Sequence, residues 1–221
     1  FSSINKINFK DVTYKIEDNY LLQNINLTIK KNQKIYITGE SGIGKSTMMK
    51  LLLKYYDLDK GKILIDNINL NDLPLTFIRN NITYIGQNEQ LFTSSILDNL
   101  KLITKDETKI KEVCDISLVT DFLKKNNLNL DYHIEENATN LSGGEKKKII
   151  LARGLLHLKN VLILDEVFNE ISIKEERIIL KNIMSKYQDK IIIMISHRNS
   201  NTDLFTKKYQ LKGDGKLYET K

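Results

Sequence analysis

The stretch Gly39-Glu40-Ser41-Gly42-Ile43-Gly44-Lys45-Ser46-Thr47 decides the fold of this chain. It follows an apolar segment at 35–37, and a segment with helical spacing runs from Lys45 to about Tyr55. The spacing G-x-x-x-x-G-K-[ST] between a strand and a helix is typical of a phosphate-binding loop, in which glycines let successive N–H groups turn inward at the positive end of a helix. We expect Lys45 to contact the β- and γ-phosphates of a nucleotide and the Ser46 hydroxyl to ligate Mg²⁺. The alternative is a glycine-rich turn with a coincidental Lys-Ser pair, which does not explain the flanking strand and helix.

A second motif ends a buried segment farther along the chain. The apolar run 161–164 is followed directly by Asp165 and Glu166. Because ligands bind at the carboxyl ends of parallel strands, we expect Asp165 to hold Mg²⁺ through water. We expect Glu166 to act as general base on the attacking water. The alternative is a polar strand exit whose acids cap a helix, and the phosphate-binding loop upstream argues against it.

The apolar pattern predicts an α/β fold with helices on both faces of a sheet. Uninterrupted apolar runs at 161–164 and 191–195 are typical of parallel strands that are buried on both faces. Alternation in 25–29 indicates a half-exposed antiparallel strand. Residues 88–140 are more polar and predict helices, with a turn at 124–127. Further strands are expected at 4–14, 21–29, 34–37 and 62–65, and a tight turn at 212–215.

Length and composition agree with one large globular domain or two small ones. The chain has 221 residues, 41% hydrophobic and 28% charged, and its net charge of +6 mildly favours an anionic partner. Its one cysteine, Cys114, cannot form an intrachain disulfide or a zinc cluster, so we expect a reducing compartment. No apolar run approaches the roughly 18 residues that span a bilayer. The start Phe1-Ser2-Ser3 lacks an initiator Met and a signal pattern, which predicts a soluble piece and is consistent with a cut from a longer chain.

A third motif, Leu141-Ser142-Gly143-Gly144-Glu145, precedes a helical segment expected from Lys146 to Leu156. With this motif the chain resembles the nucleotide-binding domain of an ATP-binding-cassette (ABC) transporter, whose signature usually has Gln where Glu145 stands. The resemblance covers essentially the whole chain. It implies that the Ser and both Gly residues of the motif contact the γ-phosphate of ATP bound to a second copy. The alternative for Ser142 is a simple N-cap.

The resemblance implies a fold and a division of the chain. The fold would be α/β: a P-loop NTPase (RecA-like) core with a mostly parallel sheet, an N-terminal antiparallel β-subdomain and an inserted α-helical subdomain. A single domain would span 1–221, with the ATP-binding core in 1–87 and 148–221 and the helical subdomain in 88–147. The cofactors would be ATP and Mg²⁺.

Two further residues match family elements, and two positions depart from them. Gln87 resembles the Q-loop glutamine, which reaches Mg²⁺ and the attacking water and relays the nucleotide state to the membrane domain. His197 resembles the switch histidine that contacts the γ-phosphate, although a lone His is more often structural. Ser172 stands where the family's D-loop has Asp. Ile16 stands where an aromatic ring usually stacks on adenine, and Tyr14 on the same strand face could stack instead or be a core aromatic.

The resemblance extends to exporter-type cassettes. Residues 88–100 contain LF-x-x-SI-x-x-N, and 134–140 resemble the exporters' X-loop with Glu136 at its acidic position. The alternative for the first segment, which is compatible with an exporter, is an amphipathic helix capped by Ser94 or Ser95. The implied activity is ATP hydrolysis that powers export across the cytoplasmic membrane through head-to-tail dimerisation. The Lys-, Asn- and Ile-rich style also resembles bacteriocin and lantibiotic peptide exporters.

The implied partners are a second copy of the chain and a transmembrane domain fused upstream, at the cytoplasmic face of a bacterial membrane. A cassette acting on nucleic acid is one competing hypothesis, suggested by the positive charge. Only 97 residues separate Lys45 from Ser142, which excludes the long coiled coil of DNA-repair cassettes, and no Arg-rich patch appears, so no nucleic-acid partner is expected. A module that senses ATP without hydrolysing it is the other hypothesis. Glu166 argues against it, whereas Ser172 and Ile16 leave it open.

Overall fold

The computed structural model describes residues 3–220. Phe1 and Ser2, at which the N-terminal stretch without a signal pattern begins, lie outside the described residues. The chain divides into two compact units. Unit 1 comprises the residues up to Tyr84, 159–165 and those from Asp189 onward, and unit 2 comprises 85–158 and 166–188. No helix within residues 3–220 is long and apolar enough to cross a membrane.

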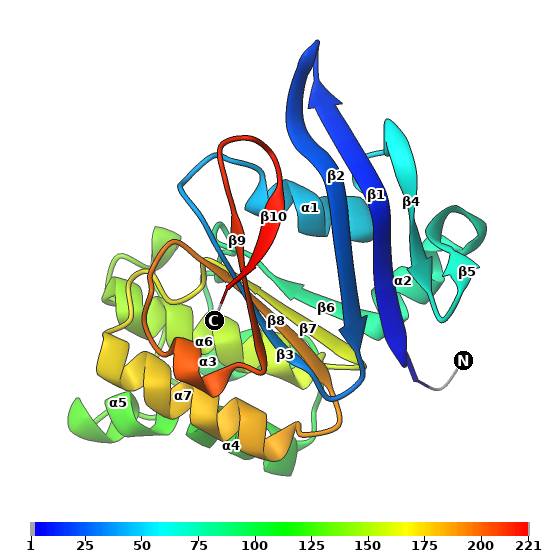
Figure 1. Ribbon diagram of the computed structural model, residues 1–221. Helices are drawn as coiled ribbons and strands as arrows, with labels where there is room; N and C mark the ends of the chain where they lie inside the picture. Colours follow the sequence, from blue (N-terminus) through cyan, green and yellow to red (C-terminus); the bar gives the residue numbers. More distant parts are fainter. Residues whose placement is uncertain (1–2, 221) are drawn as a thin grey trace. The chain divides into compact units, whose positions relative to one another are not determined.

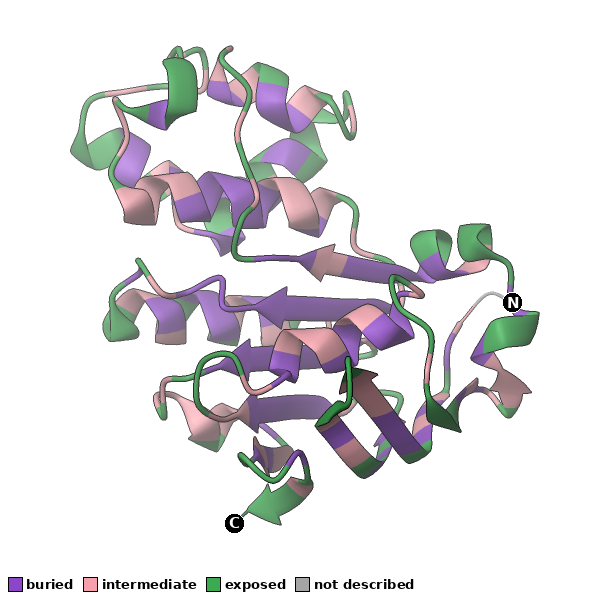
Figure 2. Ribbon diagram, turned by 90° about the horizontal axis from the view of Figure 1, so that it is seen from above, coloured by how far each residue is buried: buried purple, intermediate pink, exposed green. Residues whose placement is uncertain are grey.

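A six-stranded sheet with the order β10-β9-β3-β8-β7-β6 forms the centre of unit 1 (Figure 1). β7 is parallel to β8, β8 to β3 and β3 to β9, whereas β10 is antiparallel to β9. β7 and β8 are buried at every position (Figure 2), which confirms the buried parallel strands that the apolar runs predict. The bounds are β3 Lys34–Thr38, β6 Ile82–Ile85, β7 Val161–Asp165, β8 Ile191–Ser196, β9 Lys207–Leu211 and β10 Leu217–Thr220.

A second, antiparallel sheet with the order β2-β1-β4-β5 contains the N-terminal strands of unit 1. In β2 (Asn19–Lys30), Ile25, Leu27 and Ile29 are buried and the residues between them are exposed, as the alternation predicts. Apolar side chains of both sheets join those of α1 in one hydrophobic cluster. The other elements are β1 Lys6–Ile16, β4 Lys60–Ile65, β5 Ile68–Asn69, α1 Lys45–Leu52, α2 Leu75–Asn81, and the 3₁₀ turns Leu70–Asp72 and Thr202–Leu204.

The helix after the phosphate-binding loop is shorter than predicted. α1 ends at Leu52 rather than near Tyr55. Lys54 adopts a φ of 60°, in the left-handed region, and this turns the chain out of the helix. The tight turn at 212–215 is confirmed, because the Gly215 N–H donates to the Lys212 carbonyl at 2.9 Å between β9 and β10.

Unit 2 is helical, as residues 88–140 predict. Its helices are α3 Ile96–Lys101, α4 Glu107–Ile116, α5 Val119–Lys125, α6 Gly143–Leu156 and α7 Ile173–Lys186, with a 3₁₀ turn at Glu136–Ala138. Ser95 is the N-cap of α3, and its hydroxyl accepts the Asp98 N–H at 3.0 Å, so of the two expected caps Ser95 is the one formed. The turn at 124–127 is also present, since α5 ends there and Asn127 has a φ of 54°.

α7 packs on α4 within unit 2. The Asn182 side-chain N–H donates to the Ile116 carbonyl at 3.2 Å, and Lys186 forms an ion pair with Glu112. The compact helical unit therefore includes α7, which the expected helical segment 88–147 does not. The α/β fold with a mostly parallel sheet, an antiparallel part and a helical part is confirmed, and the subdomain bounds stay a prediction.

Candidate nucleotide site

The phosphate-binding loop of unit 1 depends on glycine at two positions. Gly39 has a φ of 152°, and a β-carbon there would lie 2.5 Å from the Leu211 carbonyl oxygen. Gly44 has a φ of 108° and is the N-cap of α1, where it provides no side-chain cap. The first N–H groups of α1 therefore face the loop without a capping oxygen, which is the arrangement that binds a phosphate.

Lys45 supplies the positive charge of this loop. Its side chain is buried, and its ammonium donates to the carbonyl oxygens of Gly39 at 2.8 Å and Glu40 at 2.7 Å. These two hydrogen bonds hold the ammonium over the loop, beside the free end of α1. A phosphate that enters the loop would therefore be attracted by an ammonium that is already held in place.

Ser46 and Asp165 come together, as predicted for a Mg²⁺ site. The Ser46 hydroxyl donates to Oδ1 of Asp165 at 2.9 Å, and Asp165 is 2% exposed. Among residues 3–220 no group of three or more His, Cys, Asp or Glu could hold a metal ion. A hydroxyl and one carboxylate fit Mg²⁺, which takes few protein oxygens and completes its shell with phosphate and water. Nucleotide oxygens would therefore have to complete the site.

Tyr84 is a site residue that the sequence analysis missed. Its hydroxyl donates to Oδ2 of Asp165 at 2.6 Å, so both oxygens of this carboxylate are engaged. The contact arises because β6, which carries Tyr84, neighbours β7 in the sheet. A polar aromatic three residues before Gln87 was the available signal, but the sequence does not give the strand order that is needed to interpret it.

His197 follows β8 and is exposed. Hydrogen bonds fix the residues before and after it. The Ser196 hydroxyl accepts the Arg198 N–H at 3.0 Å, and the Tyr36 hydroxyl donates to the Arg198 carbonyl. The turn that carries His197 is thus held to β3, while the imidazole lies at the surface. Its predicted contact with a γ-phosphate stays a prediction.

Tyr14 stacks on Tyr56, with ring centroids 5.7 Å apart and planes at 28°. Ile16, at the position of the family's usual aromatic, is 54% exposed. Tyr14 is partly buried and also packs against the hydrophobic cluster, as expected for the alternative of a core aromatic. Stacking of adenine on Tyr14 stays a prediction.

Glu166 and Gln87 belong to unit 2. Glu166 is buried and has a φ of 55°, an uncommon conformation for a residue other than glycine. Gln87 is exposed, and its carbonyl accepts a hydrogen bond from the ammonium of Lys147 on α6. α6 therefore fixes the backbone that carries Gln87 and leaves its amide side chain at the surface.

The signature helix begins three residues earlier than predicted, at Gly143 instead of Lys146. Ser142 is its N-cap and accepts the Glu145 N–H at 3.3 Å, while Oε2 of Glu145 accepts the Ser142 N–H at 2.9 Å. This reciprocal capping box stabilises a first turn that two glycines would otherwise weaken. Ser142 is therefore an N-cap, as the alternative proposed, and its contact with a nucleotide on a second copy stays a prediction.

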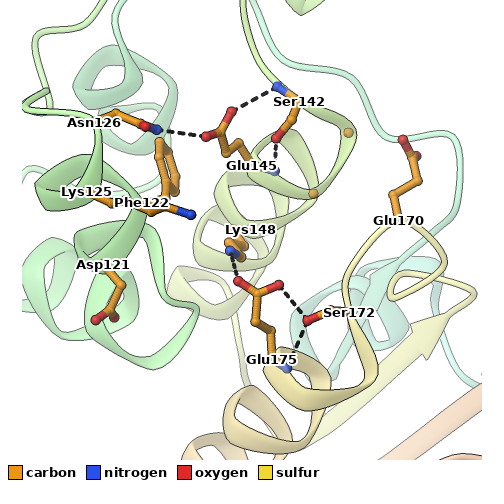
Figure 3. Close-up of a pocket in the computed structure, with 12 residues that line it drawn as sticks. Asp121, Phe122, Lys125, Asn126, Ser142, Glu145, Lys148, Glu170, Ser172 and Glu175 are labelled. Carbon is orange, nitrogen blue, oxygen red and sulfur yellow. Dashed lines mark hydrogen bonds and ion pairs between the residues drawn. The ribbon is translucent and has the colours of Figure 1, made fainter.

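Glu145 also joins the signature to α5. Its Oε1 accepts a hydrogen bond from the Asn126 side chain at 2.9 Å (Figure 3). Burial raises the pKa of the Glu145 carboxyl, but hydrogen bonds from Ser142 and Asn126 and the charge of Lys148 outweigh burial, so its pKa lies below the ordinary value. The carboxylate that replaces the usual Gln is thus ionised, and its hydrogen bonds are made within its own unit.

A pocket of about 560 Å³ opens beside the signature (Figure 3). Its lining joins three parts of unit 2, namely the end of α5, the first turns of α6 and the segment from Glu170 to Glu175. Ser172 caps α7 and donates to Glu175 at 2.8 Å, and the same carboxylate pairs with Lys148 of α6 at 2.7 Å. Ser172 at the D-loop position is therefore connected through Glu175 to the signature helix.

Comparison with known proteins now decides the family. The family described as ABC transporter matches residues 22–169. The chain belongs to this family. The predicted resemblance to an exporter-type ATP-binding domain is confirmed by both sequence and structural relatives.

The relatives of this ABC transporter domain are longer proteins. The chain is 33% identical over 202 residues to the ATP-dependent lipid A-core flippase of Pasteurella multocida (strain Pm70), which covers 89% of this chain and 35% of that protein. It is 34% identical over 183 residues to the lactococcin-G-processing and transport ATP-binding protein LagD of Lactococcus lactis subsp. lactis, covering 81% and 26%. A structure of a bacterial Atm1-family ABC exporter with ATP bound matches with a TM-score of 0.90 at 25% identity, covering 99% of this chain and 39% of that one.

Proposed function

We propose that this chain is the ATP-hydrolysing domain of an exporter and that two copies pair head to tail around ATP. The single observation that carries the proposal is the buried ammonium of Lys45, held over a glycine loop next to the Ser46–Asp165 pair. A buried cation, a free helix end and two oxygen ligands form a site for a nucleoside triphosphate with its metal.

Each residue of this chain has a defined part in the proposed reaction. Lys45 and the N–H groups of the loop bind and orient the β- and γ-phosphates. Ser46 and Asp165 would hold Mg²⁺, which supplies positive charge to the phosphate oxygens when it is bound. Glu166 takes the proton of the attacking water, and Gln87 and His197 orient the water and the γ-phosphate.

The same site and the relatives' names support two proposed partners. The signature would contact the nucleotide of a second copy, because its glycines leave backbone N–H groups at a helix start. A membrane domain would dock on unit 2, whose side chains Phe92, Leu102 and Ile103 are 61%, 61% and 40% exposed. The domain would lie at the cytoplasmic face of a bacterial membrane. The likeness to LagD supports a peptide as the exported substrate, whereas the likeness to the flippases supports a lipid.

Substituting the proposed base tests this function. In Glu166→Gln, phosphate release from ATP should fall roughly 10²- to 10⁴-fold, the usual contribution of a general base, while ATP-dependent pairing persists. The matched control is Glu107→Gln, which removes an exposed carboxylate at the start of α4 and should leave turnover unchanged. Unchanged turnover in Glu166→Gln would remove Glu166 from this role. Failure of ATP to pair the copies, seen by light scattering, would refute the head-to-tail proposal.

A further inference from the structure

Glu170 lies directly against the signature glycines. A β-carbon built on Gly143 would collide with Oε2 of Glu170 and would lie 2.8 Å from its Cδ. The backbone oxygen of Glu170 would be 3.0 Å from a β-carbon on Gly144. A side chain at Gly143 would require the Glu170 carboxylate to shift, and one at Gly144 would press on the Glu170 backbone, so the carboxylate occupies the space beside the first turn of α6.

This position is electrostatically favourable for a carboxylate. The start of α6 carries the partial positive charge of a helix N-terminus. Lys147, one turn along α6, adds a full charge: burial lowers its pKa, and the nearby charge of Glu170 acts in the opposite direction. Among residues 3–220 no hydrogen bond or ion pair holds the Glu170 carboxylate, so it can leave this position without breaking a directed bond.

The pocket around the signature is already acidic before a nucleotide arrives. Four carboxylates line it against two lysines: Asp121, Glu145, Glu170 and Glu175, with Lys125 and Lys148. The Glu145 carboxylate accepts hydrogen bonds from Ser142 and Asn126, and the Glu175 carboxylate accepts them from Lys148 and Ser172, so both are held in place by partners. In Figure 3, Glu170 rises from the loop before α7 on the side of the pocket away from Asn126. A phosphate bound at Gly143 would therefore lie next to the charge of Glu170.

We propose that Glu170 sets the affinity of the signature for the nucleotide of the second copy, because its carboxylate occupies the place that a phosphate of that nucleotide must take. The inference rests on the proposed head-to-tail pairing. Two anions cannot share one helix start, so pairing requires Glu170 to move aside. The carboxylate thereby weakens pairing and raises the ATP concentration at which copies come together.

The test compares Glu170→Gln with its parent, both in the Glu166→Gln background so that paired copies accumulate. Pairing is measured by light scattering over a series of ATP concentrations with Mg²⁺. Removing one charge at a helix end should lower the ATP concentration for half-maximal pairing at least about twofold. The gain should shrink as salt rises from about 0.05 to 0.5 M, because salt screens an exposed charge. Glu107→Gln is the matched control and should change nothing.

Two outcomes would overturn the inference, and they differ from failure of the proposed function. If Glu170→Gln pairs at the same ATP concentration as its parent, or at a higher one, the carboxylate does not oppose pairing. Glu170→Ala, which also frees the space beside Gly143, should pair at least as readily as Glu170→Gln, and weaker pairing of both variants would give the carboxylate a supporting role instead. If no variant pairs with ATP, while a fluorescent ATP analogue binds single copies, the head-to-tail proposal itself falls.

Discussion

Cys114 on α4 shows how burial changes one side chain. It is 2% exposed, and burial together with the neighbouring Asp115 charge raises its pKa to about 12. The thiolate is the reactive form, so the folded chain should react very slowly with a thiol reagent at pH 8 and should release one equivalent of thiol in denaturant. Colour development with an aromatic disulfide reagent measures this, and Cys114→Ala provides the blank. A full equivalent that reacts at once in native buffer would contradict the burial.

The same pKa fixes the sign of a pH dependence. Above its ordinary pKa of about 9, the thiol of the unfolded chain loses its proton, while the thiol of the folded chain keeps it up to about 12. The unfolded state then binds fewer protons, so the contribution of Cys114 to the free energy of unfolding falls as pH rises through this window. Urea unfolding at pH 8 and pH 10 should show a smaller loss of stability in Cys114→Ala than in the parent.

At the residue scale, the sequence predicts the position of a residue when its motif and the flanking elements determine the local backbone. The loop around Lys45 and the pairing of Ser46 with Asp165 follow from spacing, because the flanking strand and helix define where these residues lie. Tyr84 could not be found in this way, because its contact with Asp165 depends on which strand neighbours β7. The contact of Glu170 with Gly143 likewise joins residues that are 27 positions apart and share no motif.

At the element scale, strands were easier to predict than helix ends. Buried parallel strands are continuous apolar runs, and β7 and β8 match them to within one residue. The start of α6 was misplaced because Gly143 and Gly144 are poor helix formers, and only the reciprocal bonds of Ser142 and Glu145 begin the helix there. Helix ends of this kind depend on side-chain geometry and not on the apolar pattern.

The contact between α6 and α7 supplies the next prediction. Lys148 and Glu175 are 2.7 Å apart, with side chains 8% and 40% exposed. Glu175→Gln should lower the free energy of unfolding by roughly 1–2 kcal/mol, because the Lys148 ammonium is left buried with a weaker acceptor. The double variant Lys148→Met/Glu175→Gln should recover part of this loss, because Met removes the buried ammonium that Glu175→Gln leaves without its charged partner. Urea unfolding of the four proteins of the cycle measures the coupling. Additive losses would show that the pair contributes nothing beyond its separate side chains.

At the scale of the whole molecule, a bound ligand acts on the stability of the folded chain. Under the proposed function ATP binds only where Lys45 and the loop are assembled, so ATP with Mg²⁺ should stabilise the folded state by about 2.7 kcal/mol at 100 times its dissociation constant. For a chain of this size that is a rise in Tm of roughly 5–10 °C. Lys45→Ala should lose the rise, whereas Lys50→Ala, a control lysine in the last turn of α1, should keep it.

The metal's share of this stabilisation can be separated with the same measurement. Ser46→Ala removes one of the two oxygens that would hold Mg²⁺, so the rise in Tm with ATP and EDTA should be unchanged. The extra rise that Mg²⁺ adds should shrink, because the carboxylate of Asp165 would hold the cation without the hydroxyl. An equal Mg²⁺ increment in Ser46→Ala and the parent would mean that the cation binds elsewhere. A full rise in Lys45→Ala would mean that the nucleotide binds elsewhere too, and the loop would lose its proposed role.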